Sequence, residues 1–279
     1  MNVEVINVQN KLLSPYIQAF LFLSASGTKT YSYTTFPNAN LCLSIYLNNH
    51  INYNTKPGQN LCRVTKSDVF FKSRLYGFHN QPFNASVESS LDQICILFHP
   101  GALRTFTNVS FEELLGSENV FDIVFPTADK SFLEQLFAKT ENLMRAKFLE
   151  RFLLSRTSSL NLSPIVLNAL SEMNGNAGDL LKIEDISQIC RVNPSTLYRL
   201  FLADIGQAPK SFLKTIRFRK ALKYVLAQDE NSFTNIAYLN YFHDQPHFNK
   251  EIKRYSGYNP RLLRKIANIE QQQLAWITN

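Results

Sequence analysis

The chain has 279 residues, of which 45% are hydrophobic and 13% aromatic, so it can fill sizeable hydrophobic cores and general disorder is excluded. Its formal net charge of +7 is unevenly distributed: residues 1–154 carry 13 Lys or Arg and 12 Asp or Glu, whereas residues 155–279 carry 16 and 10. This asymmetry favours a polyanion as the partner of the C-terminal part, although a basic face that serves only solubility has the same composition.

The cysteines and the apolar runs indicate the compartment. Cys42, Cys62, Cys95 and Cys190 show neither a C-x-x-C pair nor the spacing of zinc ligands, and scattered free thiols are typical of a reducing cytosol. The N-terminal sequence lacks the cationic start and apolar core of a secretory signal, and runs such as AFLFL are too short to cross a bilayer. We therefore expect a cytoplasmic protein without a membrane partner.

Residues 1–128 predict a mainly β domain. Segments rich in β-branched and aromatic residues alternate with clusters of Asn, Pro and Gly, a pattern typical of strands and turns. The strand-like segments are YSYTTF, LCLSIYL, DVFFKSRLYGF and DQICILF, and the separators include FPNAN and YNTKPGQN. In SFEELLG, Ser110 and Glu113 predict a capping box at the start of a short helix that ends at Gly116.

Residues 129–154 predict one amphipathic helix with a broad apolar stripe. The stripe consists of Leu133, Leu136, Phe137, Leu143, Met144, Phe148 and Phe152. Such a stripe either covers the β domain or pairs with the same helix of a second chain to make a homodimer, and the pattern does not distinguish the two. Residues 155–163 are polar and Ser-rich, which indicates an interdomain linker.

From residue 164 onward the sequence predicts helices, and one helix-turn-helix pattern occurs twice. In each copy a short apolar helix is followed by a break, an N-cap and a second helix that a glycine ends; the caps are Asn193 and Asp244, and the glycines are Gly206 and Gly257. The residues expected to face inward on the two first helices are Ile183, Ile186, Ile189 and Cys190 in copy one, and Phe233, Ile236, Ala237 and Leu239 in copy two.

Residues 209–228, between the two copies, predict a long helix with one apolar face and a basic remainder. At a rise of 1.5 Å per residue, ~19 helical residues make a rod of about 28 Å. One turn of B-DNA measures about 34 Å. A rod of this length with a recognition helix at each end can place both helices in successive major grooves on one face of the duplex.

The segments LYRLF, IGQAPKSFLKTIRFRKAL and NIAYLNYFHDQPHFNKEIKRYSGYNP resemble the C-terminal domain of AraC/XylS-family transcription regulators. The similarity covers residues 164–265 and both helix-turn-helices in order. It implies an α+β chain: a mainly-β N-terminal sensor domain (a cupin-like barrel or a sandwich) with flanking helices, then an all-α DNA-binding domain over 164–279 with about seven helices. ICILFHPGALRTF and FEELLG resemble the end of the sensor domain in one subgroup. Arg191 and Tyr241 depart from the family, which usually has Gly in these turns; a left-handed non-Gly residue costs about 1 kcal/mol.

The N-terminal half of a recognition helix faces base edges. The predicted base-reading residues of copy one, on which positions that face bases in the family fall, are Ser195, Tyr198 and Arg199. The matching positions of copy two are Gln245, Pro246, His247 and Lys250. Arg199 and Lys250 suit guanine, and Gln245 suits adenine; His247 has the alternative role of a buried histidine that fixes the second lobe. The predicted phosphate-binding group, which sets register without reading sequence, is Lys210, Lys214, Arg217, Lys253, Arg254, Arg261 and Lys265. The alternative for each base-reading or phosphate-binding candidate is a solvated surface side chain that makes no contact with DNA.

Enzyme motifs do not fit this sequence. His243 and His247 imitate the spacing of the H-E-x-x-H zinc motif, but Pro246 belongs in a first helical turn and so places His243 before the helix. His50, His79 and His99 lie too far apart for a cupin metal site, and phosphate loops and nucleophile elbows are absent. No metal or cofactor is therefore expected.

The sequence thus predicts a transcription regulator that reads two successive major grooves and is gated by its N-terminal domain. The expected partners are double-stranded DNA with a site of about 17–20 base pairs, RNA polymerase and a small-molecule effector. The alternative is an architectural protein that binds nucleic acid without sequence preference and carries a separate sensor domain.

Overall fold

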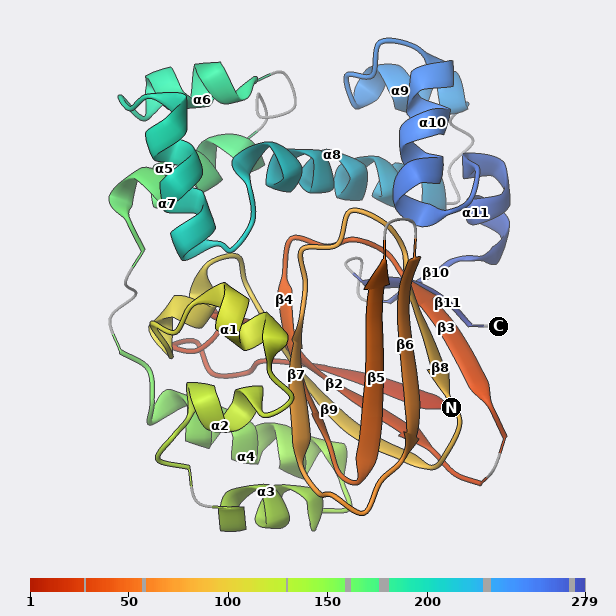
Figure 1. The fold of residues 1–279 in the computed structure, drawn as a ribbon. Coiled ribbons are helices and arrows are strands. Elements are labelled where there is room, and N and C mark those ends of the chain that lie inside the picture. Colours follow the sequence, from red (N-terminus) through yellow and green to blue (C-terminus); the bar gives the residue numbers. More distant parts are fainter. Residues whose placement is uncertain are drawn as a thin grey trace.

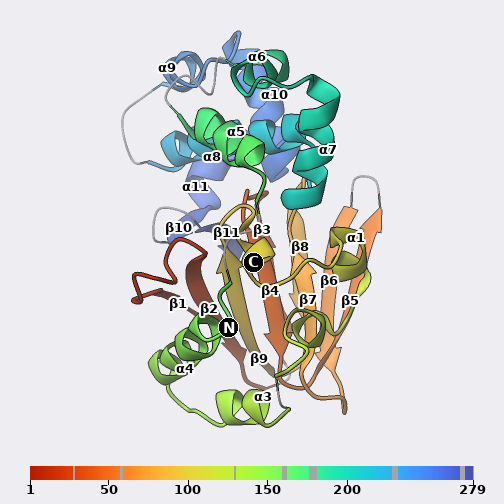
Figure 2. The same cartoon turned by 90° about the vertical axis from the view of Figure 1, so that its left-hand side faces the viewer.

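The computed structural model describes residues 1–27, 29–56, 59–128, 130–158, 162–175, 181–227, 232–270 and 274–278. These residues form a β-rich N-terminal part with short helices on one face, followed by a helical C-terminal part (Figure 1). The two views agree that the helical part covers one end of the sheets (Figures 1 and 2). The predicted α+β organisation is therefore confirmed.

Two β-sheets make up the N-terminal part. The first sheet has the order β1 (Asn2–Asn7), β2 (Ile17–Ala25), β9 (Leu91–Phe98), β4 (Leu41–Tyr46) and β7 (Lys72–Tyr76). The second sheet has the order β10 (Asn268–Glu270), β11 (Leu274–Thr278), β3 (Tyr31–Thr35), β8 (Phe83–Val87), β6 (Gln59–Lys66) and β5 (Asn49–Lys56). Among the named strands, β6 and β8 pair in parallel and the other neighbours are antiparallel.

Strand β9 lies in the middle of the first sheet and is buried on both faces. Ile94, Ile96 and Phe98 belong to the core between this sheet and the short helices, whereas Cys95 belongs to the core shared with the second sheet. Successive side chains of a strand point to opposite faces, so a strand buried on both sides becomes apolar throughout. This explains the nearly continuous apolar run in DQICILF.

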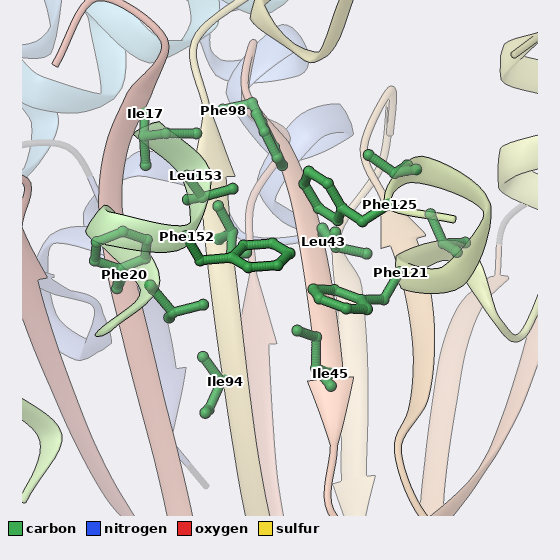
Figure 3. Packing of buried hydrophobic residues seen from close by; sticks show 14 of the residues in the cluster. Ile17, Phe20, Leu43, Ile45, Ile94, Phe98, Phe121, Phe125, Phe152 and Leu153 are labelled. Carbon is green, nitrogen blue, oxygen red and sulfur yellow. The ribbon is translucent and has the colours of Figure 1, made fainter. Parts of the chain in front are cut away.

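Short helices cover the outer face of the first sheet. They are the 3-10 helix η1 (Ala102–Thr105) and the α-helices α1 (Phe111–Gly116), α2 (Val120–Val124), α3 (Lys130–Phe137) and α4 (Asn142–Leu154). The predicted cap of α1 is confirmed, because the backbone N–H of Glu113 donates to Ser110 Oγ at 3.2 Å. Phe121 and Phe125, labelled in Figure 3, pack on Phe152 of α4 with ring centroids 5.7 and 5.1 Å away.

The segment predicted as one helix over residues 129–154 forms two helices, α3 and α4. The break is stabilised by Arg145, which donates from Nε to Lys139 O at 2.8 Å and from Nη2 to Phe137 O at 3.1 Å. The same guanidinium forms a two-pronged ion pair with Asp92, at 2.7 and 2.8 Å. A single buried arginine thus satisfies carbonyl groups at the end of α3 and joins the helices to the sheet.

The apolar sides of α3 and α4 pack on the first sheet, which is one of the two roles expected for this segment. Leu133, Leu136, Leu149 and Phe152 are buried there. Leu143 and Met144 are about half exposed, at 47% and 49%. Pairing of this segment with a second chain stays a prediction.

The helical part contains seven described helices, in agreement with the predicted number. They are α5 (Pro164–Asn174), α6 (Ile183–Ile189), α7 (Pro194–Asp204), α8 (Pro209–Leu226), α9 (Phe233–Leu239), α10 (Gln245–Ser256) and α11 (Pro260–Ile266). The first half of α8 packs with α5–α7 in one core, and the second half packs with α9–α11 in another. Among the described helices, none is long and apolar enough to span a bilayer.

Beyond α11 the chain returns to the β-rich part. Strand β11 pairs with β3, so that Trp276 lies opposite Thr35 and Ile277 opposite Thr34. Ile277 is buried in the core of the second helical lobe, which also takes in Phe36 from the N-terminal part. The sequence predicts no strand here, and the helical region ends at Ile266.

Candidate nucleic-acid interface

The first helix-turn-helix consists of α6 and α7. The backbone N–H of Thr196 donates to Asn193 Oδ1 at 2.7 Å, which confirms the predicted N-cap, and Pro194 occupies the first turn of α7. Leu197 and Phe201 are fully buried and hold the inner side of α7 against α5 and α8. The opposite side of α7 is therefore available to a partner.

The second helix-turn-helix consists of α9 and α10 and repeats this construction. The backbone N–H of His247 donates to Asp244 Oδ1 at 2.7 Å, so the second predicted N-cap is also confirmed. This hydrogen bond and a contact with the His243 ring lower the pKa of Asp244. Phe248 and Ile252 are fully buried, and Gly257 ends the helix with a left-handed φ of 81°.

Both turns have the left-handed geometry for which the family usually uses glycine. Arg191 has φ 54° and Tyr241 has φ 56°. In each turn the residue that follows donates its N–H across the turn: Val192 to Ser187 O at 3.0 Å, and Phe242 to Ala237 O at 2.9 Å. Arg191 and Tyr241 thus adopt the left-handed conformation and carry its conformational cost.

Helix α8 joins the two lobes. Its 18 residues correspond to about 27 Å at 1.5 Å per residue. Its apolar residues divide between the two lobe cores, so both ends of the rod are fixed by packing; they include Phe212, Ile216, Leu222 and Val225. This packing sets a definite separation between α7 and α10.

The two second helices, α7 and α10, have the same orientation relative to the sheets. Their N-terminal ends lie beside α6 and α9, at the end of the molecule remote from the strands (Figure 1). Their C-terminal ends approach the N-terminal part. A Cβ on Gly206 would lie 2.6 Å from Phe111, and one on Gly257 would lie 3.3 Å from Pro82. Both N-terminal halves therefore face the same side of the molecule.

Most of the predicted base-reading side chains are exposed at this end. Exposed residues are Ser195, Tyr198, Arg199, Pro246, His247 and Lys250. Gln245 is partly buried, and its Oε1 accepts a hydrogen bond from Thr234 Oγ1 of α9 at 2.6 Å. The alternative of a buried His247 does not hold, because this side chain is exposed. His243 precedes α10, as Pro246 requires.

The predicted phosphate-binding residues fall into two groups. Lys210, Lys253, Arg254, Arg261 and Lys265 are exposed, whereas Lys214 and Arg217 are partly buried in a cavity of about 130 Å³ between α8 and α10. Arg217 also donates from Nη2 to Leu181 O at 2.9 Å, so it helps to hold the first lobe together. The C-terminal half of α10 and the helix α11 lie nearer the strands than the N-terminal half of α10 does (Figure 1).

Asn249 on α10 occupies the position that corresponds to Tyr198 on α7, and it was not among the predicted base-reading residues. Asn249 is five residues after Asp244, as Tyr198 is five residues after Asn193, so the two occupy the same helical position. Counting from the cap in both copies would have found it.

The inward faces predicted for α6 and α9 need one correction each. Ile189 is 43% exposed and Leu239 is 57% exposed, although both were expected to face inward. Each lies two residues before the left-handed residue of its turn, at the last position of its helix. The neighbouring Cys190 and Asn240 take the buried positions instead.

A separate cavity of about 160 Å³ lies between the two sheets and α8. Its walls are largely apolar and include Leu21, Tyr33 and Phe83 from the strands, together with Arg219 from α8. Burial lowers the pKa of Arg219 to about 10 and that of His79, also in the wall, to about 4. At neutral pH the arginine is therefore charged and the histidine neutral. A cavity of about 150 Å³ suffices for a benzene-sized molecule.

Comparison with known proteins links the two parts to known sequence families. The model of a helix-turn-helix domain matches residues 186–266, and that of a domain of unknown function (DUF6597) matches residues 10–119. The HTH-type transcriptional activator RhaS of Escherichia coli (strain SE11) is 28% identical over 132 residues, which is 47% of this chain and 45% of the activator. The matched region therefore spans less than half of that relative.

Solved structures with similar regions include the C-terminal domain of AraT, a response regulator from Geobacillus stearothermophilus, at 26% identity and a TM-score of 0.36 over 40% of this chain and 92% of that one. ToxT from Vibrio cholerae covers 88% of this chain and 97% of its own, at 12% identity and a TM-score of 0.42. From the match of the helix-turn-helix model and the similarity to the activator, together with the two lobes described above, residues 186–266 form a helix-turn-helix domain of the AraC type.

Proposed function

We propose that this protein binds a specific DNA sequence by placing α7 and α10 in two successive major grooves, and that a small molecule in the cavity between the sheets and α8 controls this binding. The observation that carries the proposal is the common orientation of α7 and α10 at the two ends of α8. A separation set by a rod of about 27 Å suits two grooves about 34 Å apart once the width of the helices is added.

Arg199 and Lys250 are the central base-reading residues in this proposal. Each lies six residues after the cap of its helix and is exposed. Arginine and lysine both bond guanine O6 and N7 in the major groove. Tyr198 and Asn249 hold the adjacent position, where a ring packs on a thymine methyl and an amide pairs with adenine.

The basic residues of α8, α10 and α11 bind phosphates as a group and fix the protein on the duplex. Their charge supports affinity for any DNA, while the recognition helices supply the preference among sequences. The resulting site has a length of about 17–20 base pairs, and RNA polymerase is the partner on which the bound regulator acts.

Control by a small molecule is supported by the position of the cavity. Tyr33, Thr35 and Phe36 line it from β3 and its end, and Arg219 lines it from α8. Phe36 also lies in the core of the second lobe. A molecule in the cavity therefore contacts the sensor part and the rod that spaces the two recognition helices. Any difference in its affinity between two arrangements of the lobes shifts the balance between them.

Selection of bound genomic fragments by the full-length protein, followed by competition binding, tests the DNA-binding proposal. We expect one preferred site with two contacted segments about one helical turn apart. Equal affinity for all competitor sequences would instead support the architectural alternative. The Arg199→Ala variant serves as a matched control, because it should lose preference in one segment and keep the other.

A further inference from the structure

Two of the four cysteines lie near each other on the same wall of this cavity. Cys42 is on β4 and Cys95 is on the adjacent antiparallel strand β9, where it lies opposite Ser44. Residues two apart on a strand share a face, so Cys42, Ser44 and Cys95 point the same way. All three line the cavity. Cys42 keeps part of its surface accessible, whereas Cys95 is buried.

A hydrogen-bond network connects these thiols. Ser44 Oγ lies 3.4 Å from Cys42 Sγ and 3.2 Å from Cys95 Sγ. Gln93 donates from Nε2 to Ser44 Oγ at 3.2 Å and also lies 3.3 Å from Cys95 Sγ. Ser44 Oγ accepts a hydrogen bond from Gln93, so the hydroxyl proton of Ser44 can be donated to either Cys42 Sγ or Cys95 Sγ.

The network makes the two thiols chemically different. Hydrogen bonding from Cys95 and, to a smaller extent, from Ser44 lowers the pKa of Cys42 against the effect of burial. The same pairing, together with burial, raises the pKa of Cys95 well above its usual value. Burial also raises the pKa of Cys62, on β6 of the second sheet, to about 11. The thiolate is the reactive form of cysteine. Cys42 lines the cavity and is the one of the two with accessible surface, so its position and the direction of its pKa shift both favour it as the nucleophile.

We propose that Cys42 captures small α,β-unsaturated ketones or aldehydes that enter this cavity, and so makes it a covalent sensor of such electrophiles. The cavity's role as the effector site rests on the proposed function. In the reaction Cys42 Sγ forms a bond to the β-carbon and the π electrons of the C=C bond move to the carbonyl as an enolate. The α-carbon then takes up the proton that the thiol has lost, by way of Ser44 or water. The net change is addition of S–H across C=C, so neither an oxidant nor a reductant is consumed.

Strand geometry favours this chemistry over a disulfide between the two cysteines. The register places Leu97 opposite Cys42 and Ser44 opposite Cys95, so the two cysteines are diagonal neighbours. Diagonal neighbours in an antiparallel pair are about 7–8 Å apart, whereas disulfides join Cα atoms about 4.4–6.8 Å apart. At this usual diagonal spacing a disulfide lies outside the ordinary range of Cα separations, whereas addition of an electrophile needs only one of the two cysteines. The cavity also has room for a six-membered ring.

The test uses the purified full-length protein and cyclohex-2-enone, with cyclohexanone as the matched ketone that lacks the C=C bond. Mass spectrometry of peptides gives the rate of adduct formation at each cysteine. We expect Cys42 to react fastest with the enone and cyclohexanone to give no stable adduct. In Cys95→Ala the reaction of Cys42 at neutral pH should slow about tenfold for each unit by which the Cys42 pKa rises, and its pH profile should move upward. The control substitution Cys190→Ser, in the helical part, should leave both the reaction rate and the pH profile of Cys42 unchanged.

Two results would overturn the proposal: reaction at Cys42 no faster than at Cys190, or an unchanged pH profile of Cys42 in Cys95→Ala. Denaturation in urea should make the rates of adduct formation at the four cysteines similar, because the faster reaction of Cys42 depends on the fold. The adduct is scored by mass and does not depend on DNA binding. An adduct without any change in DNA affinity would therefore contradict the effector role of the cavity and leave the reactivity of Cys42 standing.

Discussion

The guanidinium of Arg104 donates from Nε and Nη2 to the carbonyl oxygen of Ala203, at 3.1 and 2.8 Å. This bond joins the 3-10 helix η1 of the N-terminal part to the last turn of α7, the first of the two proposed recognition helices. Arg104 also donates from Nη1 to Val109 O at 2.6 Å and lies 4.1 Å from the ring centre of Phe111. One buried side chain thus fixes α7 to the N-terminal part that is proposed to control DNA binding.

Replacement of Arg104 by Ala should loosen the first lobe. It removes the hydrogen bonds from the guanidinium to Ala203 O and Val109 O, and a hydrogen bond that involves a charged group contributes about 1.5–3 kcal/mol. We expect faster hydrogen exchange of amides in the last turn of α7 and a weaker effect of cavity ligands on DNA binding. Arg63→Ala, which removes an exposed ion pair with Glu88, is the control and should leave exchange in α7 unchanged. Equal exchange in both variants would contradict the anchoring role of Arg104.

Glycine at the two left-handed turn positions should stabilise the protein. Arg191→Gly and Tyr241→Gly each remove a strain of about 1 kcal/mol, although part of the gain is lost to the greater freedom of the unfolded chain. The midpoint of urea unfolding should therefore rise slightly or stay constant. Ile189→Gly, which places glycine in a helix two residues earlier, should lower the midpoint. A fall as large in Arg191→Gly would show that its side chain stabilises the turn in another way.

Base-reading and phosphate-binding residues should separate in binding experiments. Arg199→Ala should cost about 1–3 kcal/mol on the preferred site and relax preference at one or two positions. Asn249→Ala should do the same in the other segment. Lys253→Ala should weaken binding to all sequences alike and lower the salt slope by about 1. If Arg199→Ala and Lys253→Ala behaved identically, the two assignments would be wrong.

Loss of Arg145 should destabilise the β-rich N-terminal part strongly. The substitution Arg145→Ala leaves Asp92 partly buried without its partner and removes the donors for two carbonyl groups at the end of α3. Breaking a buried ion pair costs about 3–5 kcal/mol. Denaturant unfolding followed by circular dichroism should show the loss. Arg63→Ala, at the exposed ion pair, should have little effect.

Stability should fall as the pH falls from about 6.5 to about 4, because His79 takes up a proton in the unfolded chain before it does so in the folded one. Burial lowers its folded pKa to about 4, so in this window the unfolded state binds more protons and unfolding becomes easier. His79→Gln should flatten the decline in urea midpoint across this window. His50→Gln, at an exposed histidine, should not. An equal slope in the wild type and His79→Gln would contradict the assignment.

Local signals in the sequence predicted the recognition helices well. Asn193 and Asp244 form the expected caps because a cap depends only on residues within one turn. The break between α3 and α4 was missed because it depends on Arg145 and Asp92, which are 53 positions apart. The pairing of Cys42 with Cys95 was missed for a similar reason, since it depends on the register of two strands and spacing along the chain carries no information about it.

The pairing of β11 with β3 also has a consequence for synthesis of the protein. Strand β3 emerges from the ribosome early, but the neighbour on one of its edges is made only after the entire helical part. Until then that edge offers unpaired backbone groups, which favour aggregation. This edge of the second sheet can therefore close only after the helical part has been synthesised, which makes it the last edge of β3 to be paired.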